Sequence, residues 1–211
     1  MSNTSIVIGS TGLVGNLLLT ELSNKNIDVL AITRKPIKEN INNIKVLEID
    51  FDSFLSDGKL PSCEHLYICL GTTIKKAGSQ EEFKKVDFEY ALAFAEKAKE
   101  AGAVKVSLVS SVGANHKSKN FYLRVKGEIE EAIKKINFEQ INIYRPSLLI
   151  GARSQSRFLE QLGQNFSFII NLFLWGPLKK YRSIKAQDLS QSIAMHNDKK
   201  GISYFYYDNF I

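Results

Sequence analysis

The chain has 211 residues, 44% of them hydrophobic and 24% charged, which suits one globular domain with a sizeable core and argues against two domains. The formal net charge is +6, but lysine pairs are scattered over several expected elements, which argues against a nucleic-acid partner. The two cysteines and three histidines lack the spacing of a disulfide framework or a metal site, so we expect no metal and buried or half-buried thiols in a reducing cytoplasm. The start MSNTS has no basic segment, so we also expect no signal peptide.

The first expected strand begins at Ser5 and runs through SIVIGSTGLVG into an amphipathic helix from about Leu13. In such a unit Gly9 would allow the sharp turn, Gly12 the approach of main-chain N–H groups to a diphosphate, and Gly15 close packing on the sheet. The positive end of the helix would then face the diphosphate. No Gly-Lys-Ser/Thr follows, which excludes a P-loop. The unit predicts nucleotide binding; the alternative is a merely structural turn.

The second expected strand, residues 27–33, is apolar almost throughout, as in a parallel strand buried on both faces. An acid at its end would bond a ribose 2′-hydroxyl, whereas a basic residue can pair with a 2′-phosphate. The chain has Arg34 and Lys35 there, while Asp28 lies at the wrong end of the strand. We therefore expect NADP(H) in preference to NAD(H), with Arg34 as the main phosphate partner. The alternative is a solvated Arg-Lys pair.

Two further strands are expected before the first long helix. Residues 44–50 predict the third strand, and Asp50 at its end would meet an adenine amino group or cap a turn. Residues 66–70 predict the fourth, which breaks at Gly71, another glycine where the backbone must approach a ligand. A helix is expected over residues 80–101 from its apolar stripe.

The fifth expected strand ends in Ser110 and Ser111, and the helix expected over residues 121–137 follows. That helix carries Tyr122 and Lys126 four positions apart, so both side chains project from one face. A neighbouring ammonium favours the phenolate form of a tyrosine, which suits the phenol to proton transfer, and the lysine can also hold nicotinamide ribose hydroxyls. A strand-end serine hydroxyl would polarise the substrate oxygen.

The spacing Tyr-x-x-x-Lys alone proves little, because the chain contains a second example. Tyr181 and Lys185 follow a Gly-Pro turn and no serine-ended strand precedes them. We expect this second pair at the surface.

The stretch after the sixth expected strand is apolar from Phe166 to Leu174, but nine residues interrupted by Asn171 cannot span a bilayer. We expect a helix that closes one end of the core. A subunit contact in a homodimer, a wall of the substrate pocket and a shallow membrane contact stay open as alternatives.

Strands alternating with helices predict an α/β fold, a doubly wound parallel sheet of about seven strands with helices on both faces. We expect one NAD(P)-binding domain over residues 1–211, with a small substrate-side extension from about residue 151.

Five motifs follow one another along the chain: GSTGLVG at 9–15, LGTTIKKAGS at 70–79, SSVGA at 110–114, YLRVKGEIE at 122–130 and YRPSLLIG at 144–151. In these motifs and their order the chain resembles the atypical short-chain dehydrogenase/reductases, and within them the group of the Tat-interacting protein oxidoreductases. The resemblance implies a Rossmann fold and assigns residues to the dinucleotide: Gly9, Thr11, Gly12, Leu13, Val14, Gly15, Arg34, Gly71 and Thr72, with Pro146, Ser147 and Leu148 near the nicotinamide.

By the same resemblance Ser111 matches the catalytic serine better than Ser110, which stays an alternative, and Tyr122 and Lys126 complete the set. The chain is too short after the sixth strand for the substrate domain of the sugar-nucleotide epimerases, so we expect a small substrate. An NADP(H)-dependent oxidoreductase acting on a small carbonyl or alcohol is the favoured function. The alternative is a non-catalytic NADP(H)-binding sensor or scaffold protein.

Overall fold

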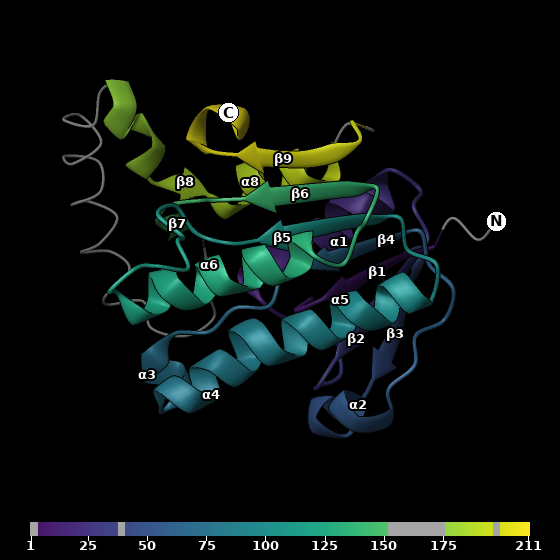
Figure 1. Cartoon of the computed structure of the whole chain (residues 1–211). Coiled ribbons are helices and arrows are strands. Elements are labelled where there is room, and N and C mark those ends of the chain that lie inside the picture. Colours follow the sequence, from purple (N-terminus) through teal and green to yellow (C-terminus); the bar gives the residue numbers. More distant parts are fainter. Residues whose placement is uncertain (1–3, 38–40, 152–175, 196–198) are drawn as a thin grey trace.

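The computed structural model describes residues 4–37, 41–151, 176–195 and 199–211 (Figure 1). Its centre is a seven-stranded sheet in the order β3-β2-β1-β4-β5-β6-β9, in which neighbouring strands pair in parallel. The strands are β1 (Ser5–Ile8), β2 (Val29–Thr33), β3 (Ile44–Glu48), β4 (His65–Ile68), β5 (Lys105–Val109), β6 (Gln140–Tyr144) and β9 (Gly201–Phe205). The predicted doubly wound parallel sheet is confirmed.

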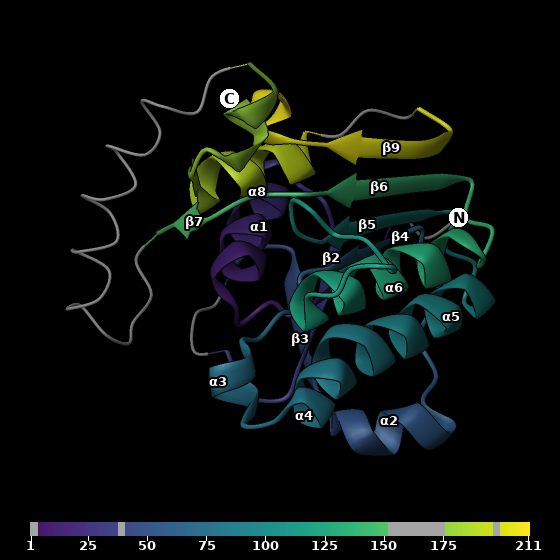
Figure 2. The same ribbon diagram turned by 60° about the vertical axis from the view of Figure 1, so that its left-hand side comes forward.

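Helices cover both faces of the sheet, as Figures 1 and 2 show. One face carries α1 (Leu13–Asn24) and α8 (Ala186–Ala194); the other carries α2 (Phe51–Asp57), α5 (Ala91–Glu100) and α6 (Phe121–Lys134). Successive side chains of a strand point to opposite faces. In β1, Ile6 and Ile8 pack in the core under α5 and α6, and Val7 packs in the core under α1 and α8. The strand is therefore apolar at three successive positions, residues 6–8.

The single helix expected over residues 80–101 is three consecutive segments. A turn of π-helix, η1 (Lys85–Tyr90), lies between α4 (Gln80–Lys84) and α5. Such turns widen the helix locally and re-aim its side chains. A separate short helix, α3 (Ile74–Ala77), precedes α4 after a cap by Thr73, whose hydroxyl accepts a hydrogen bond from the Lys76 N–H.

The third strand ends earlier than expected, at Glu48, because the following residues form α2. The Asp50 carboxylate accepts hydrogen bonds from the Ser53 N–H at 2.8 Å and from the Ser53 hydroxyl at 3.0 Å, which caps this helix. The main-chain hydrogen bond of Ser53 lowers the pKa of the Asp50 carboxyl below its usual value. Of the two roles expected for Asp50, the structure shows the cap.

The chain beyond β6 adds β7 (Leu149–Ile150) and β8 (Ile184–Lys185), which pair in parallel, and the short 3₁₀ segments η2 (Gly176–Tyr181) and η3 (Tyr207–Asn209). The apolar stretch Phe166–Leu174 lies outside the described residues, so its expected core, homodimer, pocket and membrane roles stay predictions, as does the division into domain and extension. Within the described ranges, no helix is long and apolar enough to cross a bilayer, and no His, Cys, Asp and Glu side chains gather into a metal site.

Candidate functional site

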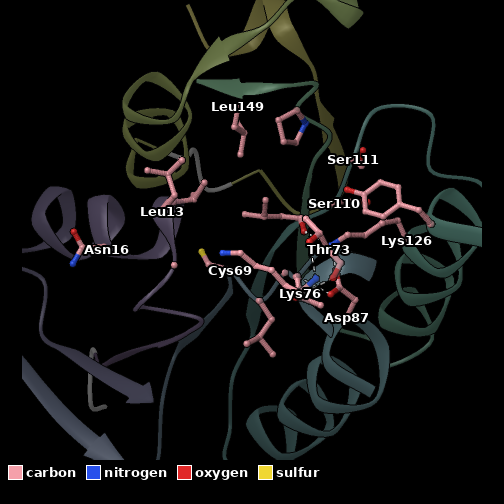
Figure 3. A pocket seen from close by; sticks show the side chains of 18 of the residues that line it. Leu13, Asn16, Cys69, Thr73, Lys76, Asp87, Ser110, Ser111, Lys126 and Leu149 are labelled. Atoms are coloured by element: carbon pink, nitrogen blue, oxygen red, sulfur yellow. Dashed lines mark hydrogen bonds and ion pairs between the residues drawn. The ribbon is translucent and has the colours of Figure 1, made fainter. Parts of the chain in front are cut away.

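A cavity of about 780 Å³ lies at the carboxyl ends of the central strands (Figure 3). Its walls come from the start of α1, from the loops after β4 and β6, from the end of β5 and from α6. In open α/β sheets, ligands bind outside the carboxyl ends of the strands, at the point where the strand order changes direction. Figure 3 shows Leu13 and Asn16 on one side of the cavity and Ser110, Ser111, Lys126 and Asp87 gathered on the other.

The glycine loop after β1 forms one wall, and its glycines are held by different constraints. Gly9 has a φ of +77°, and a Cβ there would lie 2.4 Å from the main chain of Cys69. A Cβ on Gly15 would lie 2.3 Å from the Gly9 carbonyl oxygen. These two glycines are required by the packing of the loop itself. Gly12 lines the cavity, and a Cβ there would lie 3.1 Å from that same oxygen.

The N-terminus of α1 fits an anionic group. Thr11, Gly12, Leu13 and Val14 line the cavity, and within the described part of the chain no side chain caps the first N–H groups of α1. Unpaired N–H groups at a helix N-terminus favour negative charge. This wall therefore suits the diphosphate of a dinucleotide, as the glycine spacing predicts.

The opposite wall brings Tyr122 and Lys126 of α6 to the cavity. The Lys126 ammonium lies 2.8 Å from the Asp87 carboxylate, and the two side chains are 6% and 0% exposed. It also donates to the Val109 carbonyl oxygen at 3.5 Å. Burial lowers the pKa of Lys126, but the Asp87 carboxylate, helped by Tyr122 and Glu130, outweighs this effect and holds it above the usual value. Lys126 is therefore a cation.

The two strand-end serines both line the cavity, but they are bonded differently. The Ser110 hydroxyl donates to the buried Glu130 carboxylate, which also forms a two-point ion pair with Arg145, one of whose contacts is 3.0 Å. Arg145 in turn donates to the Tyr206 hydroxyl at 3.0 Å. Among the described residues, the half-buried Ser111 hydroxyl makes only a long 3.4 Å contact with the Val112 carbonyl oxygen. Ser111 is thus the serine whose hydroxyl is available to a ligand.

Other predicted residues divide between the cavity and the surface. Gly71, Thr72, Pro146 and Ser147 line the cavity, and the Ser147 hydroxyl donates to the Arg182 carbonyl oxygen. Leu148 is 61% exposed and is not among the described residues that line the cavity, whereas its neighbour Leu149 is.

Arg34 and Asp50 are not among the described residues that line the cavity. Arg34 is exposed after β2, with its guanidinium 5.5 Å from the centre of the Phe51 ring. Tyr181 and Lys185 are exposed as expected, the tyrosine by 43%.

Sequence reasoning missed several polar residues of the cavity, among them Asn16 on α1, Lys76 on α3 and Asp87 on η1. Figure 3 shows the Lys76 side chain reaching into the cavity. Asp87 had a usable signal, because it lies four residues after Phe83 on the apolar stripe of its helix. An acid on a buried stripe needs a partner.

Known proteins resemble this chain over most of its length. The model of the NAD dependent epimerase/dehydratase family matches residues 5–206. Protein HTATIP2 of Rattus norvegicus is 35% identical over 175 residues, covering 79% of this chain and 71% of the relative. Protein FMP52, mitochondrial, of Candida albicans is 33% identical over 208 residues, covering 94% and 89%.

Solved structures share the fold at low identity. MoeE5 in complex with UDP-glucose and NAD superposes with a TM-score of 0.71 at 17% identity, covering 96% of this chain and 76% of that chain. Human epimerase family protein SDR39U1 (isoform 2) with NADPH superposes with a TM-score of 0.66 at 18% identity, covering 96% of this chain and 74% of that chain.

The expectation of a cytoplasmic location is wrong, because several relatives, from Candida albicans, Debaryomyces hansenii and Emericella nidulans, are named as mitochondrial proteins. The expectation rested partly on the two cysteines, which are indeed free, Cys63 buried and Cys69 half-buried. Burial raises the pKa of Cys63 to about 11 and that of Cys69 to about 12. These raised pKa values result from burial of the two thiols. They do not distinguish one cellular compartment from another.

Proposed function

The chain belongs to the NAD dependent epimerase/dehydratase family, and on this premise we propose that it is an NADP(H)-dependent oxidoreductase that reduces a small carbonyl compound. Membership makes it an NAD(P)-dependent protein of the atypical short-chain dehydrogenase/reductase type. The preference for NADP(H), the Ser/Tyr/Lys chemistry and the small substrate are the proposal.

One observation carries the proposal: Ser111, Tyr122 and Lys126 line the same cavity as the uncapped N-terminus of α1. The chemistry that a reduced dinucleotide held there would supply is hydride transfer to the carbonyl carbon. Tyr122 would give its phenolic proton to the carbonyl oxygen, so that hydride and proton together form the alcohol. Ser111 would donate a hydrogen bond to the same oxygen, where negative charge develops during transfer.

Lys126 has two tasks in this proposal, and its surroundings suit both. As a buried cation it favours the phenolate that Tyr122 becomes after giving up its proton. An ammonium has three N–H donors, of which the ion pair with Asp87 and the hydrogen bond to the Val109 carbonyl oxygen would use two. The third is available for the hydroxyls of the nicotinamide ribose.

The choice of Ser111 over Ser110 follows from the bonding of the two hydroxyls. Ser110 already donates its one proton to Glu130, whose carboxylate is fixed by Arg145. A hydroxyl has a single donor, so Ser110 would have to break this buried bond to polarise a substrate. Ser111 would give up a long main-chain contact, the one hydrogen bond of its hydroxyl among the described residues.

NADP(H) is favoured by what stands at the outer end of β2. Arg34 and Lys35 are exposed there, and the strand ends without an acid that would bond a ribose 2′-hydroxyl. A guanidinium can form two charge-assisted bonds to a phosphate. The 2′-phosphate would lie outside the cavity, close to Arg34.

The function is tested by NADPH absorbance against a panel of aldehydes and ketones, with two matched variants. Tyr122→Phe removes only a hydroxyl, so turnover should fall by roughly 10²- to 10⁴-fold while NADPH affinity hardly changes. Tyr181→Phe, in the exposed Tyr-x-x-x-Lys pair, should leave turnover unchanged. Near-full activity of Tyr122→Phe would refute the mechanism. A protein that binds NADPH but reduces nothing in the panel would be the non-catalytic sensor or scaffold.

A further inference from the structure

The Lys126 ammonium is in contact with a carboxylate from a different helix, that of Asp87. Asp87 lies on η1, and its side chain is fully buried at the cavity wall. One of its oxygens is 2.8 Å from the Lys126 ammonium, and the other accepts the Thr72 N–H at 2.9 Å. Asp87 therefore joins α6 to the loop after β4, two segments that the proposed function assigns to catalysis and to the dinucleotide.

The π turn accounts for how an acid reaches this place. Asp87 follows Phe83 on the buried stripe of its helix, and Phe83 is itself fully buried against Tyr122, with ring centres 5.6 Å apart. The extra residue of a π turn changes the direction in which the next side chains leave the helix. Carboxylates are rarely buried without a partner. The burial of Asp87 is therefore explained by its contacts with Lys126 and the Thr72 N–H.

The charge balance at Lys126 depends on this one carboxylate. Among the described residues, the charged and titratable groups that face Lys126 are Asp87 from η1 and, from its own helix, Tyr122 and Glu130. Cys69 after β4 and Lys76 from α3 line the same cavity. Glu130 is already bonded to Ser110 and Arg145. Without Asp87, burial would favour the neutral amine, which can neither stabilise a phenolate nor offer three donors.

We propose that Asp87 is a positioning residue of the site, which keeps Lys126 charged and aligned beside Tyr122. The inference rests on the proposed function of Lys126. Asp87 does not touch the reacting atoms in this scheme. It acts through Lys126, while its second oxygen accepts the Thr72 N–H of the loop after β4.

The direct test is a titration of the Lys126 ammonium by NMR, in protein labelled with ¹³C at the lysine Cε. The Lys126 signal is identified by its loss in Lys126→Arg. In the unmodified protein we expect Lys126 to titrate at higher pH than the exposed lysines. In Asp87→Asn, which keeps an oxygen for the Thr72 N–H but loses the charge, we expect it to titrate at lower pH than those lysines.

Glu131→Gln is the matched control, because Glu131 is also on α6 and pairs with a lysine, Lys134, at 2.7 Å, but at the surface. It should leave the Lys126 titration unmoved. A Lys126 that titrates like an exposed lysine in the unmodified protein, or that does not move in Asp87→Asn, would overturn the proposal. If Asp87→Asn does not fold, the titration of the unmodified protein still decides, and Asp87→Glu, which keeps the charge, should restore folding.

A kinetic measurement separates positioning from a merely structural role. The alkaline limb of the kcat profile should move to lower pH in Asp87→Asn, so that activity lost at pH 8 returns on acidification while KM for the carbonyl changes little. A structural defect would not be repaired by acid. The NMR titration needs neither NADPH nor substrate, so a displaced titration in a protein without turnover would sink the proposed function and leave the charge assignment intact. An active enzyme whose Lys126 titration is the same in Asp87→Asn would support the proposed function and overturn the role of Asp87.

Discussion

The two ends of the candidate binding site are built in different ways. The inner end, with Ser111, Tyr122 and Lys126, is held by buried contacts between segments far apart in the sequence, such as the Lys126–Asp87 ion pair. The outer end, with Arg34 and Asp50 after β2 and β3, is exposed and held locally, as in the cap that Asp50 makes three residues ahead. Substitutions should therefore act on turnover at the inner end and on cofactor choice or local stability at the outer end.

The largest effect that sharpens this contrast is expected from the two neighbouring serines. Ser111→Ala should lower kcat by about 10²- to 10³-fold, as expected for the loss of one donor to a developing oxyanion, with the melting temperature unchanged. Ser110→Ala is the matched control: it leaves the buried Glu130–Arg145 pair without one donor, so it should lower stability more than kcat. Rate loss confined to Ser110→Ala would reverse the assignment of the catalytic serine.

The glycine loop offers the next largest effect. Gly12→Val places a branched side chain where the diphosphate should approach, so NADPH affinity should fall by roughly 100-fold or more, equivalent to losing two charge-assisted hydrogen bonds. Calorimetric titration would measure the affinity for NADPH, and the melting temperature would show whether the variant is folded.

Gly9→Ala provides the contrast within the same loop. Its φ of +77° and the 2.4 Å approach to Cys69 predict a protein that melts at lower temperature, whatever its affinity for dinucleotide. If Gly12→Val melts normally and binds NADPH as the unmodified protein does, the loop does not hold the diphosphate.

At the outer end, Arg34→Ala should weaken NADPH binding by about 1 to 3 kcal/mol and leave NADH binding unchanged, because only the 2′-phosphate contact is lost. Lys35→Ala is the control for a general loss of positive charge and should change NADPH affinity less. Equal affinities for the two dinucleotides in the unmodified protein would contradict the assignment.

The smallest effect is expected from Asp50→Ala. It removes the cap of α2 and should lower the melting temperature by roughly 2 to 4 °C, the size typical of a lost N-cap in a chain of this length. The pKa of Asp50 is lowered in the fold, so this contribution is full above the usual pKa of an aspartate and is lost as the pH falls through the lowered value. A large loss of dinucleotide affinity would instead show that Asp50 meets the adenine.

The same contrast explains what could be predicted from the sequence. The strands and the turn at the glycine loop were predictable because apolar runs and glycine spacing are local signals. The parallel sheet confirms the strands. The cap by Asp50 was one of two local alternatives. The π turn at Lys85–Tyr90 leaves no mark in the apolar period, so the helix over 80–101 was expected to be regular.

The inner end was only half visible in the sequence. The motifs containing Ser111, Tyr122 and Lys126 were found, but no spacing indicates that Asp87 crosses to Lys126 or that Arg145 fixes Glu130. These pairs depend on how α6 packs against η1 and against the end of β6. The choice between Ser110 and Ser111 depended on the same packing, because only the fold shows which hydroxyl is bonded.

The most direct test of the central claim, that the cavity between α1 and α6 binds the dinucleotide beside Tyr122, is a crystal structure of the protein with NADP⁺. We expect the diphosphate at the N-terminus of α1, the 2′-phosphate at Arg34 and the nicotinamide ribose hydroxyls within hydrogen-bond reach of Lys126. A dinucleotide bound elsewhere, or one whose nicotinamide faces away from Tyr122, would contradict the claim.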